Sequence, residues 1–461
     1  MHTIEQLKTG QLKGIQRLQL QDNLTQFPSE ILQLADTLEI LDMSNNRLSS
    51  LPNDFDRLHK LKILFLSNNQ FEHLPTVLGK CANLDTIAFK ANRIKTVHGD
   101  ALPPRTRWLI LTDNDITTLP ERMGQLHGLK KLALAGNKLT SLPNSMANCH
   151  HLELIRLSAN RFESFPDWLF ELPKLAWCAL SGNPAVSPKA NHLEDENTPS
   201  ATDQTHTQIL SVKGSDIQLD QQIGEGASGV IHQATWVNPP KTLSTGASAI
   251  AVKLFKGEIT SDGYPADELN CCLATAGHEN LIKVVAQIKE PKQLGLVMEL
   301  IPVNYTNLGQ PPSLQSCTRD TFEQGQSLHI QNVHGITRQM ASTMAHMHQQ
   351  GVSHGDLYAH NTMTNPNGDM LFGDFGAASQ LSALPQHQQQ GMEKVEVRAL
   401  GYLMDDLLTL ANSRCAAYVN LVHIKDQCLQ QAHQRRPSFR DVIALLPTAH
   451  HQASTNLDPK G

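Results

Sequence analysis

The first half of the chain repeats one spacing of apolar residues. In LEILDMSNNRLSSLP from Leu38, LKILFLSNNQFEHLP from Leu61 and LKKLALAGNKLTSLP from Leu129, apolar side chains occupy the first, fourth and sixth positions and Asn the ninth. A fixed period of this length indicates stacked copies of one small structural unit. The asparagine recurs at intervals of 23 residues, with one of 22, at Asn23, Asn46, Asn69, Asn92, Asn114, Asn137, Asn160 and Asn183.

A unit of this size cannot enclose its own apolar side, so neighbouring copies are expected to share one continuous core. The leucines would point into that core, and each Asn side chain would hydrogen-bond backbone groups where the chain leaves its strand. The pattern resembles leucine-rich repeats, which implies an α/β solenoid of eight repeats over residues 1–190. We expect these asparagines to be structural and this half to carry no catalysis.

The strand faces of such a solenoid carry candidate partner-binding residues. The positions that flank the strand leucines would lie on the concave side, and they are more apolar than an exposed face needs. The alternative is lateral packing between neighbouring repeats, without a ligand. The candidate partner-binding face comprises Ile40, Ile63, Phe65, Trp108, Ile110, Leu154 and Trp177.

The repeat stops after Asn183, and the chain becomes polar. Residues 184–207 are rich in Ser, Thr, Pro and charged side chains and lack the apolar residues that a packed core needs. We therefore predict a flexible linker over residues 191–212, a second folded domain over 213–449 and a polar tail over 450–461.

Phosphate-handling motifs open the second domain. Residues 224–229 read GEGASG, and the next residues, VIHQATW, have the β-forming character of a strand rather than a helix. A hairpin with a glycine-rich tip lets backbone amides approach a triphosphate, whereas a dinucleotide fold would place a helix here. IAVK follows at Ile250–Lys253, and the helix expected after it offers Glu268 as a partner for the Lys253 amine, with Asp267 as the alternative.

Candidate catalytic and metal-binding residues follow in order. The stretch HGDLYAHN, residues 354–361, contains Asp356 and, five residues later, Asn361, and LFGDFGAAS adds Asp374. Oxygen ligands from Asn361 and Asp374 suit a hard divalent cation. Asp356 would accept the proton of an attacking hydroxyl, and Lys253 would offset phosphate charge.

With EVRALGYLMDDLL from Glu396 and QRRPSFRDV from Gln434, these motifs occur in the order in which protein kinases carry them. The chain resembles a bacterial leucine-rich-repeat serine/threonine protein kinase with a eukaryotic-like kinase domain. The resemblance runs from about residue 217 to 447 and implies an α+β two-lobed domain that binds ATP and Mg²⁺. It also implies that Glu396 anchors the backbone of the catalytic loop.

The resemblance assigns roles to individual residues. The implied catalytic residues are Asp356, Lys253, Glu268 and Asn361, and the implied metal ligands are Asn361 and Asp374. Met298 would be the gatekeeper of the nucleotide pocket. The implied ATP contacts are Ile223, Gly224, Glu225, Gly226, Ala227, Ser228, Gly229, Ile231, Ala251, Lys253, Met298, Glu299, Ile301 and Met363.

The catalytic loop departs from the protein-kinase pattern. Gly355 stands where Arg is usual, and Tyr358 and His360 occupy the places where a Lys or Arg is expected. Small-molecule kinases share the HGD sequence. Two alternatives to a protein kinase therefore stay open: a small-molecule kinase of the HGD type, and a leucine-rich-repeat scaffold with an inactive nucleotide-binding kinase domain. The missing Arg also predicts that phosphorylation after Asp374 does not switch the domain.

The activation segment is short. Only 21 residues separate Asp374 from Glu396, and no A-P-E sequence lies among them. Arg436, in the R-P-x-F signature near the C-terminus, is therefore expected to lack its usual Glu partner. The platform that docks a peptide substrate is altered as well.

Composition narrows the function classes further. The net charge of −6 over 461 residues gives no broad basic surface for nucleic acid. The eight cysteines include no C-x-x-C pair, which argues against a zinc site or a disulfide framework. Without an apolar leader or a long apolar run, we expect a cytoplasmic protein with no membrane insertion. The predicted activity is transfer of the γ-phosphoryl group of ATP to Ser/Thr of a protein, with the repeats binding a substrate or regulator.

Overall fold

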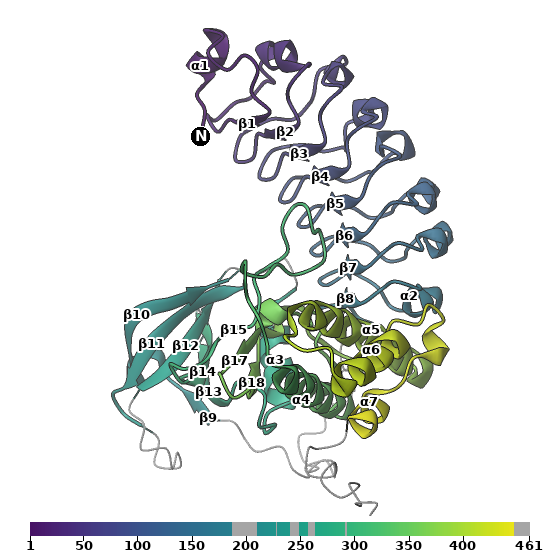
Figure 1. Ribbon diagram of the computed structural model, residues 1–461. Helices are drawn as coiled ribbons and strands as arrows, with labels where there is room; N and C mark the ends of the chain where they lie inside the picture. Colours follow the sequence, from purple (N-terminus) through teal and green to yellow (C-terminus); the bar gives the residue numbers. More distant parts are fainter. Residues whose placement is uncertain (187–209, 227, 240–248, 257–262, 291–292, 447–461) are drawn as a thin grey trace, which may run out of the picture.

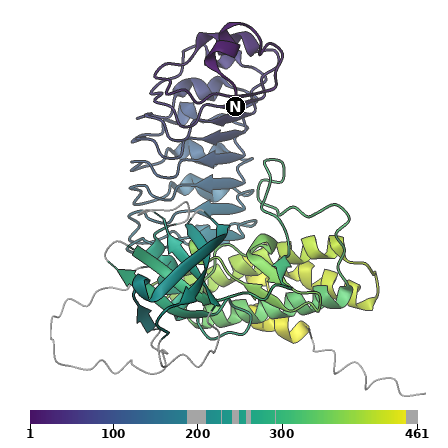
Figure 2. The same cartoon turned by 90° about the vertical axis from the view of Figure 1, so that its left-hand side faces the viewer.

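The computed structural model describes residues 1–186, 210–226, 228–239, 249–256, 263–290 and 293–446. An arched solenoid forms the N-terminal half, and a two-lobed unit packs against its last repeats (Figure 1). Figure 2 shows the same arrangement from the side, with the solenoid strands stacked above the two lobes. The predicted polar tail, 450–461, and residues 191–209 of the predicted linker lie outside the described residues.

The solenoid carries one parallel sheet of eight strands along its concave side. The first residues of neighbouring strands pair in register, from Arg17 with Ile40 to Leu154 with Trp177, as the repeat spacing predicts. The strands are β1 (Arg17–Gln19), β2 (Ile40–Asp42), β3 (Ile63–Phe65), β4 (Thr86–Ala88), β5 (Trp108–Ile110), β6 (Lys131–Ala133), β7 (Leu154–Arg156) and β8 (Trp177–Ala179). The outer helices are α1 (Ile4–Lys8), η1 (Ser29–Leu34), η2 (Phe55–Arg57), η3 (Thr76–Lys80), η4 (Gly99–Ala101), η5 (Glu121–Gln125), η6 (Asn144–Asn148) and α2 (Trp168–Glu171).

The recurring asparagines hold neighbouring repeats together. The amide nitrogen of Asn137 donates to the carbonyl oxygens of Leu111 and Leu134 at 2.9 and 3.0 Å, and its amide oxygen accepts from the backbone N–H of Ile116 at 3.0 Å. Asn160 makes the same set of bonds one repeat later. These bonds satisfy backbone groups that stacking would otherwise bury unpaired. The predicted structural role is confirmed for the seven asparagines from Asn46 to Asn183. Asn23, in the first repeat, is exposed.

The first lobe of the second unit is a six-stranded sheet with one helix. The strand order is β10-β11-β12-β14-β13-β9, and neighbours are antiparallel except β13 and β9. The glycine-rich segment joins two strands, β10 and β11, as predicted. The elements are β9 (Leu210–Val212), η7 (Gly214–Asp216), β10 (Ile217–Glu225), β11 (Gly229–Trp236), β12 (Ala249–Phe255), α3 (Pro265–Ala274), β13 (Val284–Glu290) and β14 (Gln293–Glu299).

Strand β9 corrects the predicted domain boundary. Leu210–Val212 fall within the predicted linker, yet they pair in parallel with Ala286–Ile288 of β13. Leu210 and Val212 also pack against the apolar core of this lobe. A strand of three residues is too short to show a periodic pattern in the sequence. The ordered lobe therefore includes residues that precede the predicted start at residue 213.

The second lobe is mainly helical. Met340, Met344 and Met347 of its long central helix α4 are buried, as expected for core residues. The helices are α4 (Ile330–Gln349), η8 (Ala359–Asn361), η9 (Phe375–Ala377), α5 (Gln386–Leu410), α6 (Ala416–Cys428), η10 (His433–Arg435) and α7 (Phe439–Leu445). The short strands are β15 (Thr306–Asn307), β16 (Val352–Ser353), β17 (Thr362–Thr364), β18 (Met370–Phe372) and β19 (Ser379–Gln380).

The two units share apolar cores where they meet. Leu384, just before α5, and Met392, in the second turn of that helix, belong to the buried apolar cluster of the repeats. In return, Leu154 and Trp177 of the repeats join the buried cluster of the second lobe. Burying apolar area on both sides at once stabilises this arrangement. The end of the solenoid is thereby placed beside the loops that carry the candidate catalytic residues.

Candidate active site

A cavity of about 520 Å³ lies between the two lobes and gathers the predicted nucleotide contacts. Its size suits a small-molecule ligand. Ala227 lies outside the described residues. The predicted ATP contacts that line the cavity are Ile223, Gly224, Glu225, Gly226, Ser228, Gly229, Ile231, Ala251, Lys253, Met298, Glu299, Ile301 and Met363, together with Glu268 and Asp374.

Lys253 and Glu268 form a buried ion pair at the inner end of this cavity. The Lys253 amine, on β12, contacts Oε1 of Glu268, on α3, and lies 3.9 Å from Oδ1 of Asp374. Burial works against the charge on Lys253, but the two carboxylates raise its pKa, so the amine is a cation at neutral pH. Asp267, the other acidic residue on this turn of α3, has one buried carboxylate oxygen with no hydrogen-bond partner among the described residues.

The catalytic loop holds Asp356 and Asn361 together. The Asn361 amide nitrogen donates to the backbone carbonyl of Asp356 at 3.0 Å and to Oδ2 of its carboxylate at 3.1 Å. Upstream, the backbone N–H of Gly355 donates to Oε1 of Glu396 on α5 at 2.6 Å, and His348 Nε2 lies 2.5 Å from Oε2 of the same carboxylate. The expected anchoring of the loop by Glu396 is confirmed.

The proposed metal ligands have suitable oxygen donors. Because the Asn361 nitrogen is turned toward Asp356, its amide oxygen is left for a cation. Asp374 adopts a left-handed backbone conformation, with φ of 58°, and its side chain is 54% exposed on the cavity side. Among the described residues, no group of three or more His, Cys, Asp or Glu side chains could hold a metal. An amide oxygen and a carboxylate fit a magnesium ion that also binds phosphate oxygens and water.

His354 and Phe375 have a packing role, as the sequence indicates. The His354 ring stacks on Phe372, with ring centroids 4.0 Å apart, and lies 5.2 Å from Phe375. Its Nε2 donates to the carbonyl oxygen of Gly373 at 3.0 Å. Burial lowers the pKa of His354, so the ring is neutral. This contact ties the catalytic loop to the segment that carries Asp374.

The last two repeats contact the catalytic loop directly. Arg156, at the end of β7, forms an ion pair with Oδ1 of Asp356 and donates to the carbonyl oxygen of Gly355 at 2.9 Å. The Trp177 indole N–H, on β8, donates to the carbonyl oxygen of Leu357 at 3.0 Å. The repeats therefore take part in the geometry of the candidate active site.

Gly355 is required by this packing. Its φ is +73°, and a Cβ atom there would lie 2.5 Å from the carbonyl oxygen of Ala377 and 2.8 Å from that of Cys178 in the last repeat. Both distances are shorter than side-chain atoms tolerate, and positive φ disfavours residues other than glycine. The departure from Arg at this position thus leaves room for the backbone of the solenoid.

Tyr358 and His360, which replace the basic residues expected in the loop, also contact other parts of the chain. The Tyr358 ring is buried against Trp177. His360 Nδ1 lies 2.7 Å from Oδ1 of Asp320, whose Oδ2 accepts the backbone N–H of Ala359 at 2.6 Å. Burial disfavours the charged ring of His360, but the Asp320 carboxylate raises its pKa. The sequence showed no signal for Asp320, which lies in the irregular segment between β15 and α4.

This irregular segment, residues 308–329, rises beside the concave face of the middle repeats, as the green loop in Figure 1 shows. Arg107 donates to the carbonyl oxygens of Leu314 and Gln315 at 3.0 and 3.3 Å. Farther along, the hydroxyl of Thr318 hydrogen-bonds Glu153 of the seventh repeat. The segment therefore joins the solenoid to the catalytic loop through Asp320.

Arg436 also finds a partner in the repeats. Without an A-P-E glutamate, its guanidinium donates to the carbonyl oxygens of Pro173, Lys394 and Gln430 at 2.9, 2.9 and 2.8 Å. Pro173 lies just before β8. Helix α5 begins at Gln386, soon after β19, and the Gln388 side chain donates to the carbonyl oxygen of Phe165 at 2.9 Å. The repeats thus contact both Arg436 and the start of α5.

The predicted partner-binding face divides into two parts. Ile40, Ile63, Phe65, Trp108 and Ile110 are partly exposed on the concave side. Leu154 and Trp177 are buried, at 3% and 1% exposure, against the second unit. The expectation that these two face an external partner is wrong, because the chain's own catalytic lobe covers them.

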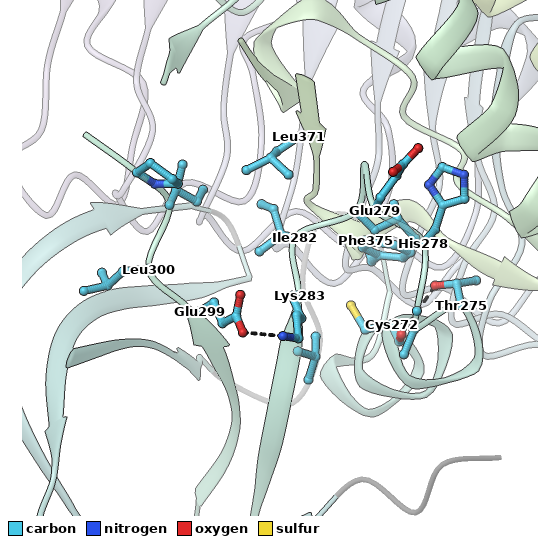
Figure 3. Close-up of a pocket in the computed structure, with 16 residues that line it drawn as sticks. Cys272, Thr275, His278, Glu279, Ile282, Lys283, Glu299, Leu300, Leu371 and Phe375 are labelled. Atoms are coloured by element: carbon cyan, nitrogen blue, oxygen red, sulfur yellow. Dashed lines mark hydrogen bonds and ion pairs between the residues drawn. The ribbon is translucent and has the colours of Figure 1, made fainter. Parts of the chain in front are cut away.

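A second cavity, of about 530 Å³, lies on the side of α3 (Figure 3). Figure 3 shows Ile282, Leu371 and Phe375 along one part of its wall and the ion pair of Lys283 with Glu299 along another. It shares wall residues with the nucleotide cavity but contains none of the proposed catalytic or metal-binding residues. Lys253, Glu268 and Asp374 line the first cavity instead.

The two-lobed fold with a lysine–glutamate pair, a catalytic loop and a DFG segment defines a protein kinase domain. Comparison with known families agrees: residues 217–411 match the family described as protein tyrosine and serine/threonine kinase. Residues 37–58, 60–81, 104–162 and 127–184 match leucine-rich repeat families. The chain thus consists of leucine-rich repeats followed by a protein kinase domain, which implies ATP and a divalent metal ion.

Curated relatives are protein kinases of eukaryotes. A protein of Oryza sativa subsp. japonica named as cyclin-dependent kinase F-2 is 29% identical over 161 residues, 34% of this chain and 45% of that protein. CTD kinase subunit alpha of Schizosaccharomyces pombe is 26% identical over 159 residues, 34% of this chain and 24% of its own. CBL-interacting serine/threonine-protein kinase 7 of Arabidopsis thaliana is 26% identical over 184 residues, 38% and 36% of the two chains.

The chain therefore spans less than half the length of each of these relatives. In the part of the chain that the structure describes, none of the helices combines the length and apolar character needed to cross a bilayer.

Proposed function

We propose that the chain is an ATP-dependent protein kinase that phosphorylates Ser or Thr of a protein, and that its repeats recruit the substrate or a regulator. The observation that carries the proposal is the ion pair of Lys253 with Glu268 beside Asp374. The Asp356–Asn361 pair is tied to the Asp374 segment, because the backbone N–H of Gly373 donates to the carbonyl oxygen of Asn361 at 3.2 Å. This arrangement provides a cation for phosphate charge, two oxygen ligands for a metal and a carboxylate for the nucleophile.

The proposed reaction assigns one task to each group. Lys253 binds the α- and β-phosphates, and Asn361 and Asp374 hold Mg²⁺, which offsets charge on the phosphate oxygens when bound. A substrate hydroxyl oxygen forms a bond to the γ-phosphorus while the bond from phosphorus to the β–γ bridging oxygen breaks. The hydroxyl proton passes to the Asp356 carboxylate, and ADP leaves.

The catalytic loop no longer favours a small-molecule kinase. Gly355 pointed toward that class. The close approach of the Cys178 carbonyl oxygen now explains why glycine is needed at this position, whichever substrate is used. Tyr358 likewise has a packing role against Trp177. An inactive scaffold is disfavoured because the Lys253–Glu268 contact, a feature of active kinases, is formed.

The partly exposed apolar face from Ile40 to Ile110 supports a role of the repeats in binding a protein. The class of hydroxyl rests on the names of the relatives, one of which is a serine/threonine-protein kinase. A bacterial source and a cytoplasmic location stay predictions.

The test is phosphoryl transfer by the full chain. Purified protein is incubated with γ-labelled ATP, Mg²⁺, casein and a mixed Ser/Thr/Tyr peptide library, beside Asp356→Asn and Lys253→Met. Asp426→Asn, which changes an exposed carboxylate on α6, is the matched control. Label on Ser or Thr with the wild type and Asp426→Asn alone supports the proposal.

Two results would contradict it. Binding of Mg·ATP without transfer to any acceptor would identify a scaffold, and ATP turnover only with added metabolites would identify a small-molecule kinase. Label found only on Tyr would correct the hydroxyl class.

A further inference from the structure

The catalytic loop has no basic side chain of its own beside Asp356. HGDLYAHN contains neither Lys nor Arg, so nothing within residues 354–361 supplies a permanent cation to this carboxylate. Phosphoryl transfer would gather negative charge at this point, where the carboxylates of Asp356 and Asp374 would face the phosphates of bound ATP. A cation close to Asp356 is therefore expected from elsewhere in the chain.

Arg156 is placed to supply it. Its guanidinium contacts Oδ1 of Asp356 from the seventh repeat, while the Asn361 amide donates to Oδ2 of the same carboxylate at 3.1 Å. The carboxylate is thus held from both sides by different elements. Its side chain remains 20% exposed, so the contact does not seal it from a substrate.

Arg156 is itself held in a fixed orientation. Its side chain is only 7% exposed, and its second amino group donates to the carbonyl oxygen of Gly355 at 2.9 Å. A buried guanidinium is costly unless it is paired, and charge-assisted bonds to a carboxylate are among the strongest that it can form. An arginine so placed constrains the direction in which Asp356 points.

We propose that Arg156 is a positioning residue for phosphoryl transfer, by which the leucine-rich repeats supply in cis the cationic partner of Asp356 that the catalytic loop lacks. This inference rests on the proposed function. Arg156 acts through Asp356, so it affects the transfer step rather than the binding of nucleotide. The repeats then serve as part of the catalytic unit as well as a binding module.

The experiment compares full-length wild type, Arg156→Lys and Arg156→Gln. Turnover, KM for ATP and binding of Mg·ATP to the unreactive enzyme are measured for each, and thermal unfolding confirms folding. Asp167→Asn is the control: it removes the negative charge from an oxygen that His387 and Gln388 contact at the same interface but away from Asp356.

We expect kcat of Arg156→Gln to fall roughly 10- to 100-fold, because a small misplacement of a catalytic group has effects of this size. KM for ATP and nucleotide binding stay within about twofold, which indicates that an interaction of the transition state was lost. Arg156→Lys recovers part of kcat because it keeps the charge, and Asp167→Asn keeps full turnover.

Three results overturn the inference while the proposed function stands. One is an unchanged kcat in Arg156→Gln. A second is a raised kcat, which would make the contact autoinhibitory. The third is an equal loss of kcat in Asp167→Asn, which would show that Arg156 acts only by stabilising the interface. A wild type without turnover overturns the proposed function itself, and this inference with it.

Discussion

The indole ring of Trp177, in the last repeat, lies face to face on the phenol ring of Tyr358 in the catalytic loop, with centroids 4.5 Å apart and planes 7° from parallel. The ring of Tyr402, on α5, also stacks near the indole, with centroids 5.4 Å apart. The stack therefore joins the solenoid, the catalytic loop and helix α5 of the catalytic lobe. Burial of three aromatic rings together makes this contact a main source of stability at the interface.

Substitution of Gly355 by alanine is predicted to distort the catalytic loop. The new Cβ would collide with the carbonyl oxygens of Ala377 and Cys178, so one of the two backbones must move. We expect kcat to fall at least about tenfold, since Asp356 is the next residue.

Gly351→Ala is the matched control. Gly351 has nearly the same φ, +70°, but its Cβ would meet only ordinary contacts at 3.7 Å or more. Both variants should lose about 1–2 kcal/mol of unfolding free energy from the positive φ. Turnover and urea unfolding measured side by side separate the two effects, and equal turnover in the two variants would refute the steric account.

The partner of Lys253 can be tested by neutral substitutions on α3. Glu268→Gln removes the carboxylate that holds the amine, and we expect a loss of kcat/KM for ATP of roughly 100-fold. Asp267→Asn changes the adjacent carboxylate, whose pKa is raised by burial, and should leave turnover intact. Steady-state kinetics of both variants decide the matter. A larger loss of kcat/KM in Asp267→Asn than in Glu268→Gln would show that Asp267, rather than Glu268, is the partner of Lys253.

Asp406, on α5, predicts a pH dependence of stability. Burial raises its pKa to about 6, although Arg319 lies 2.5 Å away and opposes the shift. The folded state thus binds this proton more tightly than the unfolded state does, and the stabilisation it gives is lost as pH rises through about 6.

We therefore expect the wild type to lose unfolding free energy relative to Asp406→Asn between about pH 4 and about pH 7. Urea titrations at both ends of this range measure the change. The difference in unfolding free energy between the two proteins could instead stay constant, or could grow in favour of the wild type as pH rises. Either result would show that the pKa of the Asp406 carboxyl is not raised in the folded state.

Most of the fold and the chemistry could be predicted because the signals are local. The repeat spacing predicts the strand columns and the asparagine bonds. Short motifs identify Lys253, which lines the nucleotide cavity, and the hydrogen-bonded pair of Asp356 and Asn361. Glu268 was found despite one extra residue in the following turn, since a helix brings its side chain to Lys253.

The docking of the repeats could not be predicted. Arg156 and Asp356 are 200 residues apart, and no periodic pattern links two such positions. Arg156 is the last residue of its strand, and Gln19 and Asp42 occupy the same place in other repeats, so its polar character did not single it out. Gly355 and Tyr358 did signal a change, but as departures from a motif they pointed toward a small-molecule kinase. Only the structure shows that Gly355 leaves space for the carbonyl of Cys178 and that Tyr358 stacks on Trp177.

The claim that the repeats complete the active site is tested most directly by comparing Trp177→Ala with Trp108→Ala in the full chain. Trp177 is buried at the catalytic loop, whereas Trp108 lies in the partly exposed part of the concave face. For each variant, turnover and amide hydrogen exchange of the segment 354–361 are recorded. Trp177→Ala is predicted to lower kcat at least about tenfold and to speed exchange in that segment, because the stack and the bond to Leu357 are lost.

Trp108→Ala should change neither. Unchanged or raised turnover in Trp177→Ala, with exchange at the catalytic loop as slow as in the wild type, would contradict the claim that the repeats complete the active site.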